Sequence, residues 1–261
     1  RMPRLVGIEA GLEVLLLGRN LQGQAAVDAG LVDELAEEGA EVAAAEAWLL
    51  SGAAHATQPW DRPGSVPLDH AQIAGALAAH RARELERMLG HEPAPLAILD
   101  CVELGLIQPI DGAIRSEMAV FSALIQRPEP RNMIRTLFLG KQAWDKAERA
   151  GEIPPEVEAA AAAIRDCADA ATRACPALRQ AGFGAGGEPL NPVQQRVGAD
   201  YWFRSDPLVR AAIAGLAGEV ARLIAPLNDA ALLQLDHACV RNGAIPAYLG
   251  GASGLAALAG G

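Results

Sequence analysis

The glycine-rich stretch GFGAGG, residues 182–187, has the spacing of a nucleotide-binding loop. Gly182, Gly184 and Gly187 form a GxGxxG pattern. In dinucleotide-binding folds such glycines let the backbone approach a pyrophosphate at a helix N-terminus, directly after a β-strand. The residues before this loop, DCADAATRACPALRQA, are typical of a helix instead. We therefore interpret the stretch as part of a flexible linker and expect no NAD binding and no resident cofactor.

A second cluster places an acid, an imidazole and a thiol close together in sequence, at Asp236, His237 and Cys239. Such groups could form a nucleophile and its base. However, residues one or two positions apart on a helix do not face each other. We expect a thiol in the core beside a solvated Asp236, and no Cys–His couple.

Metal-ligand spacing is missing elsewhere. Cys167 and Cys175 lie eight residues apart with no histidine at a zinc-binding spacing. No HxxxH or HxxEH arrangement links the histidines before residue 100, which are His55, His70, His80 and His91. We predict no metal site.

Paired carboxylates could serve as acid and base if burial separated their pKa values. Asp100 and Glu103 can share a helix face, and Glu84 can pair with Arg87 or Arg81. On exposed helices such groups are usually solvated, which is our interpretation here. The catalytic residues of this sequence are therefore unknown, and no cofactor or metal ligand is assigned.

The elements that would position these residues are predicted to be helices. The chain has 261 residues, 51 % hydrophobic and only 4 % aromatic. Apolar spacing predicts helices from Ile8, at Gln24–Ala29 with Gly30 as the stop, and over Glu37–Leu50. The one-sided apolar stripes that resume after His70 predict helices that pack on each other or on a missing neighbour. No alternating strand is found, so the fold is predicted to be mainly α.

The net charge of −10 and the lack of a Lys/Arg run argue against binding to nucleic acid or to an anionic membrane surface. Four scattered cysteines favour reduced thiols and a cytoplasmic protein. No apolar stretch is long enough to span a membrane.

The opening residues resemble the crotonase (enoyl-CoA hydratase/isomerase) superfamily. In that family a QRLPRLVG segment precedes a helix, a TGR turn, an AEEA helix and GLVDEV. The corresponding residues here are RMPRLVG at 1–7, LGR at 17–19, QAA at 24–26 and GLVDE at 30–34. The resemblance implies that residues 1–52 are closing helices of a crotonase ββα spiral.

Two later segments resemble multifunctional fatty-acid β-oxidation enzymes, such as the α-subunits of bacterial oxidation complexes. QPWDRPG at 58–64 looks like the strap after their hydratase domain, and residues 93–142 look like their helical linker. The resemblance implies a Pro/Gly-rich strap at 53–69, a helical linker domain at 70–150, and a helix with a flexible linker at 151–190.

The last region, 191–261, weakly resembles the helical C-terminal domain of 3-hydroxyacyl-CoA dehydrogenases. The positions that fit its ending are Asp236, Gly243, Pro246, Gly250 and Gly251. The NP and His that the dehydrogenase uses have no recognisable counterpart here. No GxGxxG nucleotide domain follows GKQ at 140–142, as it would in the family.

The resemblance implies a protein that hydrates or isomerises 2-enoyl-CoA thioesters, with its catalytic half upstream of this chain. The family's two catalytic glutamates and its oxyanion hole precede the QRLPR segment. Glu9 and Glu13 follow that segment, so they are not assigned. The chain alone is expected to be inactive and to oligomerise, either with the crotonase half or with itself. Two alternatives stay open: a non-catalytic helical scaffold that docks onto acyl-CoA enzymes, and a degenerate dehydrogenase remnant.

Overall fold

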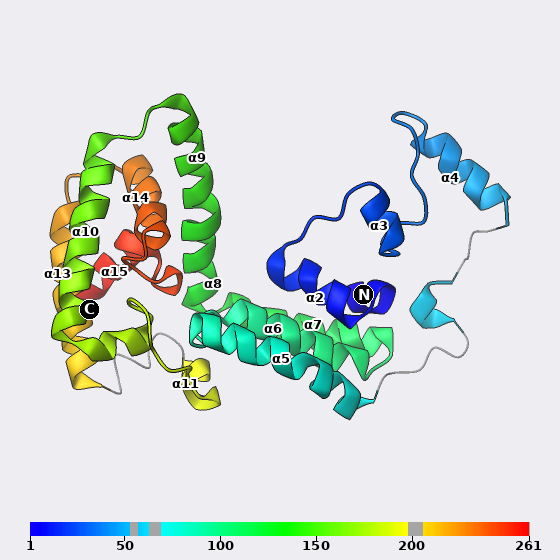
Figure 1. Cartoon of the computed structure of the whole chain (residues 1–261), viewed down its shortest axis with the longest axis horizontal. Coiled ribbons are helices and arrows are strands. Elements are labelled where there is room, and N and C mark those ends of the chain that lie inside the picture. The colour runs from blue at the N-terminus through cyan, green and yellow to red at the C-terminus, as the bar shows by residue number, and fades with distance from the viewer. Residues whose placement is uncertain (53–56, 63–68, 198–205, 261) are drawn as a thin grey trace. The chain divides into compact units, whose positions relative to one another are not determined.

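A computed structural model describes residues 1–52, 57–62, 69–197 and 206–260, and these residues form helices and loops without a β-strand (Figure 1). The predicted mainly-α fold is confirmed. The Ala- and Leu-rich composition explains it, because these residues lose little conformational freedom in a helix. None of the described helices is long and apolar enough to cross a membrane.

The chain divides into two compact units. The first comprises Arg1–His80 and Ala97–Phe121, and the second comprises Arg81–Leu96 and Ser122–Gly261. Three long helices contribute residues to both units: α5 (His70–Met88), α6 (Pro93–Leu106) and α7 (Ile110–Ile125). The domain boundaries inferred from the family resemblance are a different division of the chain and stay predictions.

The first unit begins with short helices, which are α1 (Met2–Val6), α2 (Ile8–Leu17), α3 (Gln24–Asp28), α4 (Glu41–Leu50) and the 3-10 helix η1 (Pro59–Asp61). Gly30 adopts a positive φ of 73° after α3, as the predicted stop requires. The helix expected from Glu37 begins only at Glu41, because Gly39 has a φ of 84° that a right-handed helix does not allow. Most of the predicted strap, residues 53–56 and 63–68, lies outside the described residues.

The opening residues have a local structural role. A side chain at Gly11 would lie 3.1 Å from Cα of Pro3, so this glycine allows α1 and α2 to pack closely. Arg4 donates from Nη2 to the carbonyl oxygens of Gly105, at 2.7 Å, and Gln108. A guanidinium at these carbonyls satisfies acceptors that the end of α6 leaves open.

The apolar stripes are only partly buried. Ile73, Leu77 and Leu99 are buried as predicted, but Met118 and Phe121 on α7 are 63 % and 58 % exposed. A π-helix, η2 (Ile134–Gly140), lies between α8 (Pro128–Met133) and α9 (Lys141–Ala150) and interrupts the regular α-helical spacing of the apolar residues from Met133 to Trp144. A π-turn contains more residues than an α-turn, so residues at α-helical spacing no longer share one face.

The second unit also contains α10 (Pro155–Ala174), η3 (Pro176–Ala181), α11 (Pro192–Val197), α13 (Pro207–Ile224), α14 (Asp229–Arg241), η4 (Ala247–Leu249), α15 (Gly251–Ala257) and η5 (Leu258–Gly260). Asp206 caps α13 by accepting from the backbone N–H groups of Leu208 and Val209. Asn228 caps α14 by accepting from Ala231 N–H at 3.0 Å.

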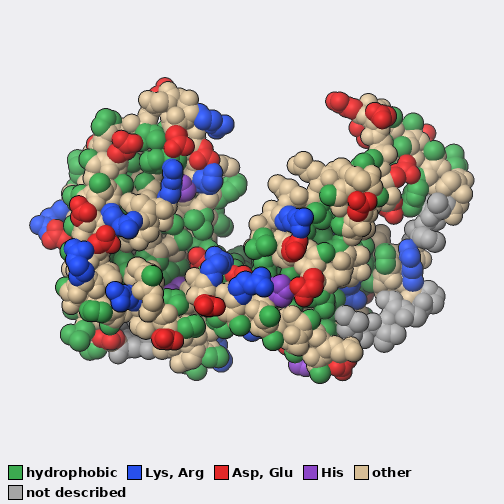
Figure 2. Space-filling view, in the orientation of Figure 1, with side chains coloured by type: hydrophobic (Ala, Val, Ile, Leu, Met, Phe, Trp, Pro, Cys, Tyr) green, Lys and Arg blue, Asp and Glu red, His purple; other side chains and the backbone are tan. Residues whose placement is uncertain are grey.

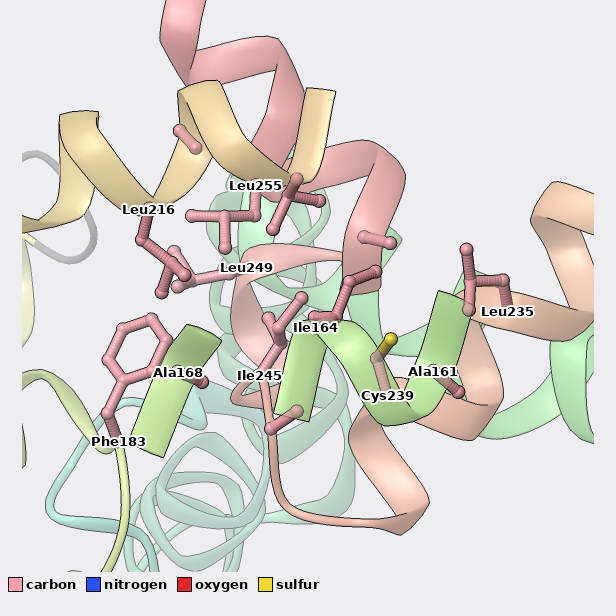
Figure 3. Close-up of a cluster of buried hydrophobic side chains, with 14 of the residues drawn as sticks. Ala161, Ile164, Ala168, Phe183, Leu216, Leu235, Cys239, Ile245, Leu249 and Leu255 are labelled. Atoms are coloured by element: carbon pink, nitrogen blue, oxygen red, sulfur yellow. The ribbon is translucent and has the colours of Figure 1, made fainter. Parts of the chain in front are cut away.

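The core of this unit lies between α10, α13, α14 and α15 (Figure 3). The buried positions of α10 follow one helical face, and they are Val157, Ala160, Ala161, Ile164 and Ala168. Ile164, Leu235 and Leu255 have no exposed surface. This helical core supports the loops that carry the candidate chemistry described next.

Candidate functional site

The GFGAGG stretch follows a helix and not a strand. It comes directly after η3, which itself follows α10, so the strand that a dinucleotide loop requires is missing from this part of the structure. Gly182, Gly184 and Gly186 have φ values between 72° and 89°. These glycines allow a tight loop, and the third glycine of the motif, Gly187, has a different role.

Gly187 is required by close packing. A side chain there would place Cβ 2.3 Å from the carbonyl oxygen of Arg179. The neighbouring Phe183 and Leu190 are buried, and Leu190 N–H donates to the carbonyl oxygen of Leu89 at 2.9 Å. We expected a flexible linker here, but the structure anchors this loop to the core through two apolar side chains and a backbone hydrogen bond.

His91 and Tyr248 form a buried stack beneath the loop. Their ring centroids are 4.5 Å apart and their planes differ by 6°. His91 Nε2–H donates to the carbonyl oxygen of Gln180 at 2.7 Å, and the Tyr248 hydroxyl donates to that of Ala181 at 2.8 Å. Both rings therefore hold the carbonyls at the end of η3, immediately before the glycines.

Burial also sets the charge states of this stack. It lowers the pKa of His91 to about 4, against the opposing effect of the Gln180 carbonyl, so the imidazole is neutral at pH 7. Burial raises the pKa of the Tyr248 hydroxyl, which stays protonated. Neither ring therefore carries a charge at pH 7.

A cavity of about 560 Å³ opens between the glycine loop, the stack and the end of α5. Its charged lining residues are Glu86, Arg87 and Glu92. Arg87 pairs with Glu84 at 3.0 Å and lies 3.7 Å from Glu92. Burial raises the pKa of Glu92. The cavity has room for a small ligand, but it presents a pre-paired cation and no aligned nucleophile and base.

The Asp236–His237–Cys239 cluster does not act as one site. Asp236 is fully buried, whereas we expected it to be solvated. Its Oδ2 accepts from Arg135 Nε at 2.7 Å, and its Oδ1 accepts from Ser253 N–H at 2.7 Å. The buried carboxylate is possible because a cation and a backbone donor replace its hydration.

The other two members of the cluster point to different partners, as the helical spacing predicted. His237 Nδ1–H donates to the carbonyl oxygen of Thr136 in η2 at 3.0 Å. Cys239 is buried in the core, and desolvation raises the pKa of its thiol, which makes it a poor nucleophile. The expected core thiol is confirmed, and His237 contacts the Thr136 carbonyl.

A group of polar residues lies between α8–η2 and α14–η4, and we call it the polar seam. Its members are Asn132, Arg135, Thr136, Asp236 and His237. Asn132 donates from Nδ2 to the carbonyl oxygen of Tyr248 at 2.9 Å. The seam joins segments about a hundred residues apart in sequence. The sequence analysis did not identify Asn132 and Arg135, because the residues around them in the sequence do not indicate which distant residues they contact.

Glycines of the C-terminal ending are also explained by this seam. A side chain at Gly251 would lie 2.6 Å from Cα of Asp236, and one at Gly250 would lie 3.0 Å from the Asn132 amide. Both glycines have positive φ values. Gly250 and Gly251, two of the positions that resemble the dehydrogenase ending, therefore have a packing role in this chain.

The remaining candidates are dispersed. Glu9 contacts His80 at 2.9 Å, and Glu13 pairs with Arg19, both on the exposed side of α2. Glu103 contacts His70 at 3.1 Å. Glu84 is buried against Arg87, which corrects the expectation of a solvated pair. His55 lies outside the described residues.

Two further observations concern a buried acidic side chain and the arrangement of possible metal ligands. Glu129 is buried and accepts two hydrogen bonds from Arg127, at 2.7 and 3.2 Å; sequence reasoning did not single it out. No three His, Cys, Asp or Glu side chains converge as metal ligands within the residues that the structure describes.

Comparison with known proteins finds distant relatives. The chain is 29 % identical over 171 residues to the fatty acid oxidation complex subunit alpha of Shewanella amazonensis. The aligned region covers 63 % of this chain and 23 % of that protein. The protein of the same name from Shewanella loihica is 28 % identical over 158 residues, covering 60 % of this chain and 22 % of that protein.

The chain thus spans less than a quarter of the length of these curated relatives. No family model matches the sequence, and no solved structure matches it. The detected relationship is a similarity to fatty acid oxidation complex α-subunits at low identity.

Proposed function

We propose that this chain is a helical part of a fatty-acid β-oxidation protein that acts on acyl-CoA thioesters. In this proposal the enoyl-CoA hydratase or isomerase chemistry belongs to residues outside the chain, of crotonase type. The chain itself contributes support and positioning. The observation that carries the proposal is the 171-residue similarity to an oxidation complex α-subunit.

The internal chemistry of the chain supports this division of labour. Hydration of an enoyl thioester needs an acid, a base and donors aimed at the developing oxyanion. In the second unit, Asp236, Glu129 and His91 are instead buried and bonded to structural partners. A buried side chain that is hydrogen-bonded to structural partners is poorly placed to exchange protons with a substrate.

The second candidate is a non-catalytic helical scaffold that docks onto acyl-CoA enzymes. Exposed apolar side chains favour it, because a helix face with Met118, Phe121 and Ile125 at least 57 % exposed has a surface suited to a partner. A dehydrogenase remnant is less well supported, since the glycine loop lacks its preceding strand.

Assays on the purified 261-residue chain and on the native gene product separate these candidates. We expect the chain alone to hydrate no crotonyl-CoA and to show no saturable NAD binding. Intact mass and N-terminal sequencing of the native product, followed by the same hydration assay, form the second arm. A native product that begins at Arg1 and does not turn over crotonyl-CoA would refute the hydratase proposal and leave the scaffold.

The oligomeric state provides an independent check. Exposed apolar faces should make the isolated chain self-associate or lose solubility. Light scattering that reports a stable monomer over a wide concentration range would argue against a missing apolar neighbour.

A further inference from the structure

Helix α4 is an apolar helix without a fully buried residue, and only Ala44 and Trp48 are partly buried. Eight of its ten residues, in the sequence EVAAAEAWLL, are Ala, Val, Trp or Leu. Nevertheless none of its residues is buried, and Val42, Leu49 and Leu50 are 73 %, 63 % and 88 % exposed. A helix that is apolar on all sides is normally covered, so the exposed surface of α4 requires a partner.

The charge around α4 restricts that partner. Between Arg19 and Arg62 the sequence has no Lys or Arg, but it has these acidic residues: Asp28, Asp33, Glu34, Glu37, Glu38, Glu41, Glu46 and Asp61. Figure 2 shows hydrophobic and acidic side chains gathered together over α4 and the loop before it. The surface is therefore apolar and strongly negative at the same place.

Glu46 lies inside the apolar cluster and not at its edge. It is four residues after Val42 and three and four residues before Leu49 and Leu50, so all three apolar side chains are its neighbours on the helix. A partner that covers these side chains must also desolvate the Glu46 carboxylate. Such a carboxylate is stable only when a cation or several donors replace its water.

These properties exclude several occupants. A second copy docked through the same face would place two sets of carboxylates opposite each other, which costs affinity. An anionic bilayer or a nucleic acid would be repelled by the same charges. An apolar protein surface with a basic rim satisfies both the apolar area and the charge.

We propose that α4 docks onto a protein surface outside this chain that is apolar at its centre, has a basic rim, and places a Lys or Arg opposite Glu46. The proposal does not depend on the reaction assigned above, because it rests only on the exposure and charge of α4.

The test begins with photo-crosslinking. A benzophenone amino acid is introduced at Leu49, or at Leu208 as a control, since Leu208 is a 74 % exposed leucine on α13 in the other unit. Both variants are irradiated in the native host, and adduct peptides are identified by mass spectrometry. We expect one dominant protein adduct that is specific to Leu49, on a peptide with apolar residues next to Lys or Arg.

The identified partner is then purified for binding measurements. Glu46→Lys in this chain should raise the dissociation constant about tenfold or more. A Lys→Glu or Arg→Glu change at the contacting residue of the partner should restore binding. Affinity should fall as salt rises. Because the Glu46 side chain is exposed, Glu46→Lys should leave the circular dichroism spectrum of the chain unchanged.

Several outcomes would overturn the proposal. These are an adduct within this chain or to a second copy of it, an adduct to lipid, and the same adducts at Leu49 and Leu208. A partner with an uncharged or acidic contact surface, or no rescue by the charge swap, would do the same.

Discussion

The replacement Arg135→Met tests whether the buried Asp236 carboxylate depends on a single cation. Arg135 Nε lies 2.7 Å from Asp236 Oδ2, and Asp236 has no exposed surface. Methionine keeps an unbranched apolar side chain of similar reach and removes only the guanidinium. Asp236 would then retain the hydrogen bond from the Ser253 amide.

The expected loss of stability is about 3 kcal/mol, at the lower end of the range for breaking a buried pair from one side. Two features keep it low. The Ser253 N–H still bonds to the carboxylate, and the Arg135 side chain is 42 % exposed, so water can reach the site it leaves. An exposed ion pair has a far smaller effect, usually below about 1 kcal/mol.

The matched control is Arg222→Met, which removes the same kind of side chain from an exposed pair with Glu219 on α13. Hydrogen exchange of the α14 and α15 amides, measured alongside urea unfolding, gives the free energy of opening for both variants. We expect a change within about 0.5 kcal/mol for the control. Equal effects of the two replacements would refute the argument that burial of Asp236 makes Arg135 important.

The pH dependence provides a second criterion. Burial raises the pKa of Asp236, while the Ser253 amide and the Arg135 guanidinium lower it. Without Arg135 the pKa should rise further, so the variant protonates Asp236 at a higher pH than the wild type. The stability difference should therefore be largest near neutral pH and shrink as the pH falls. A difference that grows in acid would contradict this account.

Three further predictions concern the glycine loop and the stack beneath it. Because the pKa of His91 is lowered to about 4, the stability of the wild type should fall by up to about 3 kcal/mol as the pH drops from 6.5 to 4. Urea titrations of His91→Phe should show a flatter dependence of stability on pH. The exposed control His70→Gln should keep the pH dependence of the wild type. Gly187→Ala should lower the stability measured by thermal unfolding by about 2 kcal/mol, because the new methyl group clashes with a carbonyl oxygen. The control Gly218→Ala places its methyl group in open space on a helix and should be neutral or stabilising by up to about 1 kcal/mol. Equal changes in the stability of the two variants would be inconsistent with the packing described. Tyr248→Phe should lose about 1–2 kcal/mol because a buried carbonyl loses its donor, and an unchanged unfolding midpoint would show that water or another group replaces it.

Local sequence patterns were sufficient for the helical class and for several helix ends, but not for the start of α4, which was expected at Glu37 and lies at Glu41. Ala- and Leu-rich periodicity predicts helices because it reflects the propensity and the one-sided burial of each segment. Asp206 followed by Pro207, and Asn228 before α14, are caps that depend only on neighbouring residues. The rejection of a Cys–His couple also needed only the angular spacing of a helix.

Only the tertiary structure determined which polar groups are buried and what they contact. Asp236 looked like a solvated residue, but α14 packs against η2 and α15, which place Arg135 and Ser253 on its two oxygens. The π-turn of η2 likewise changed which apolar residues share a face. These outcomes depend on contacts between residues far apart in sequence, for which a single sequence has no local signal, whereas helix formation and capping are set within a few residues.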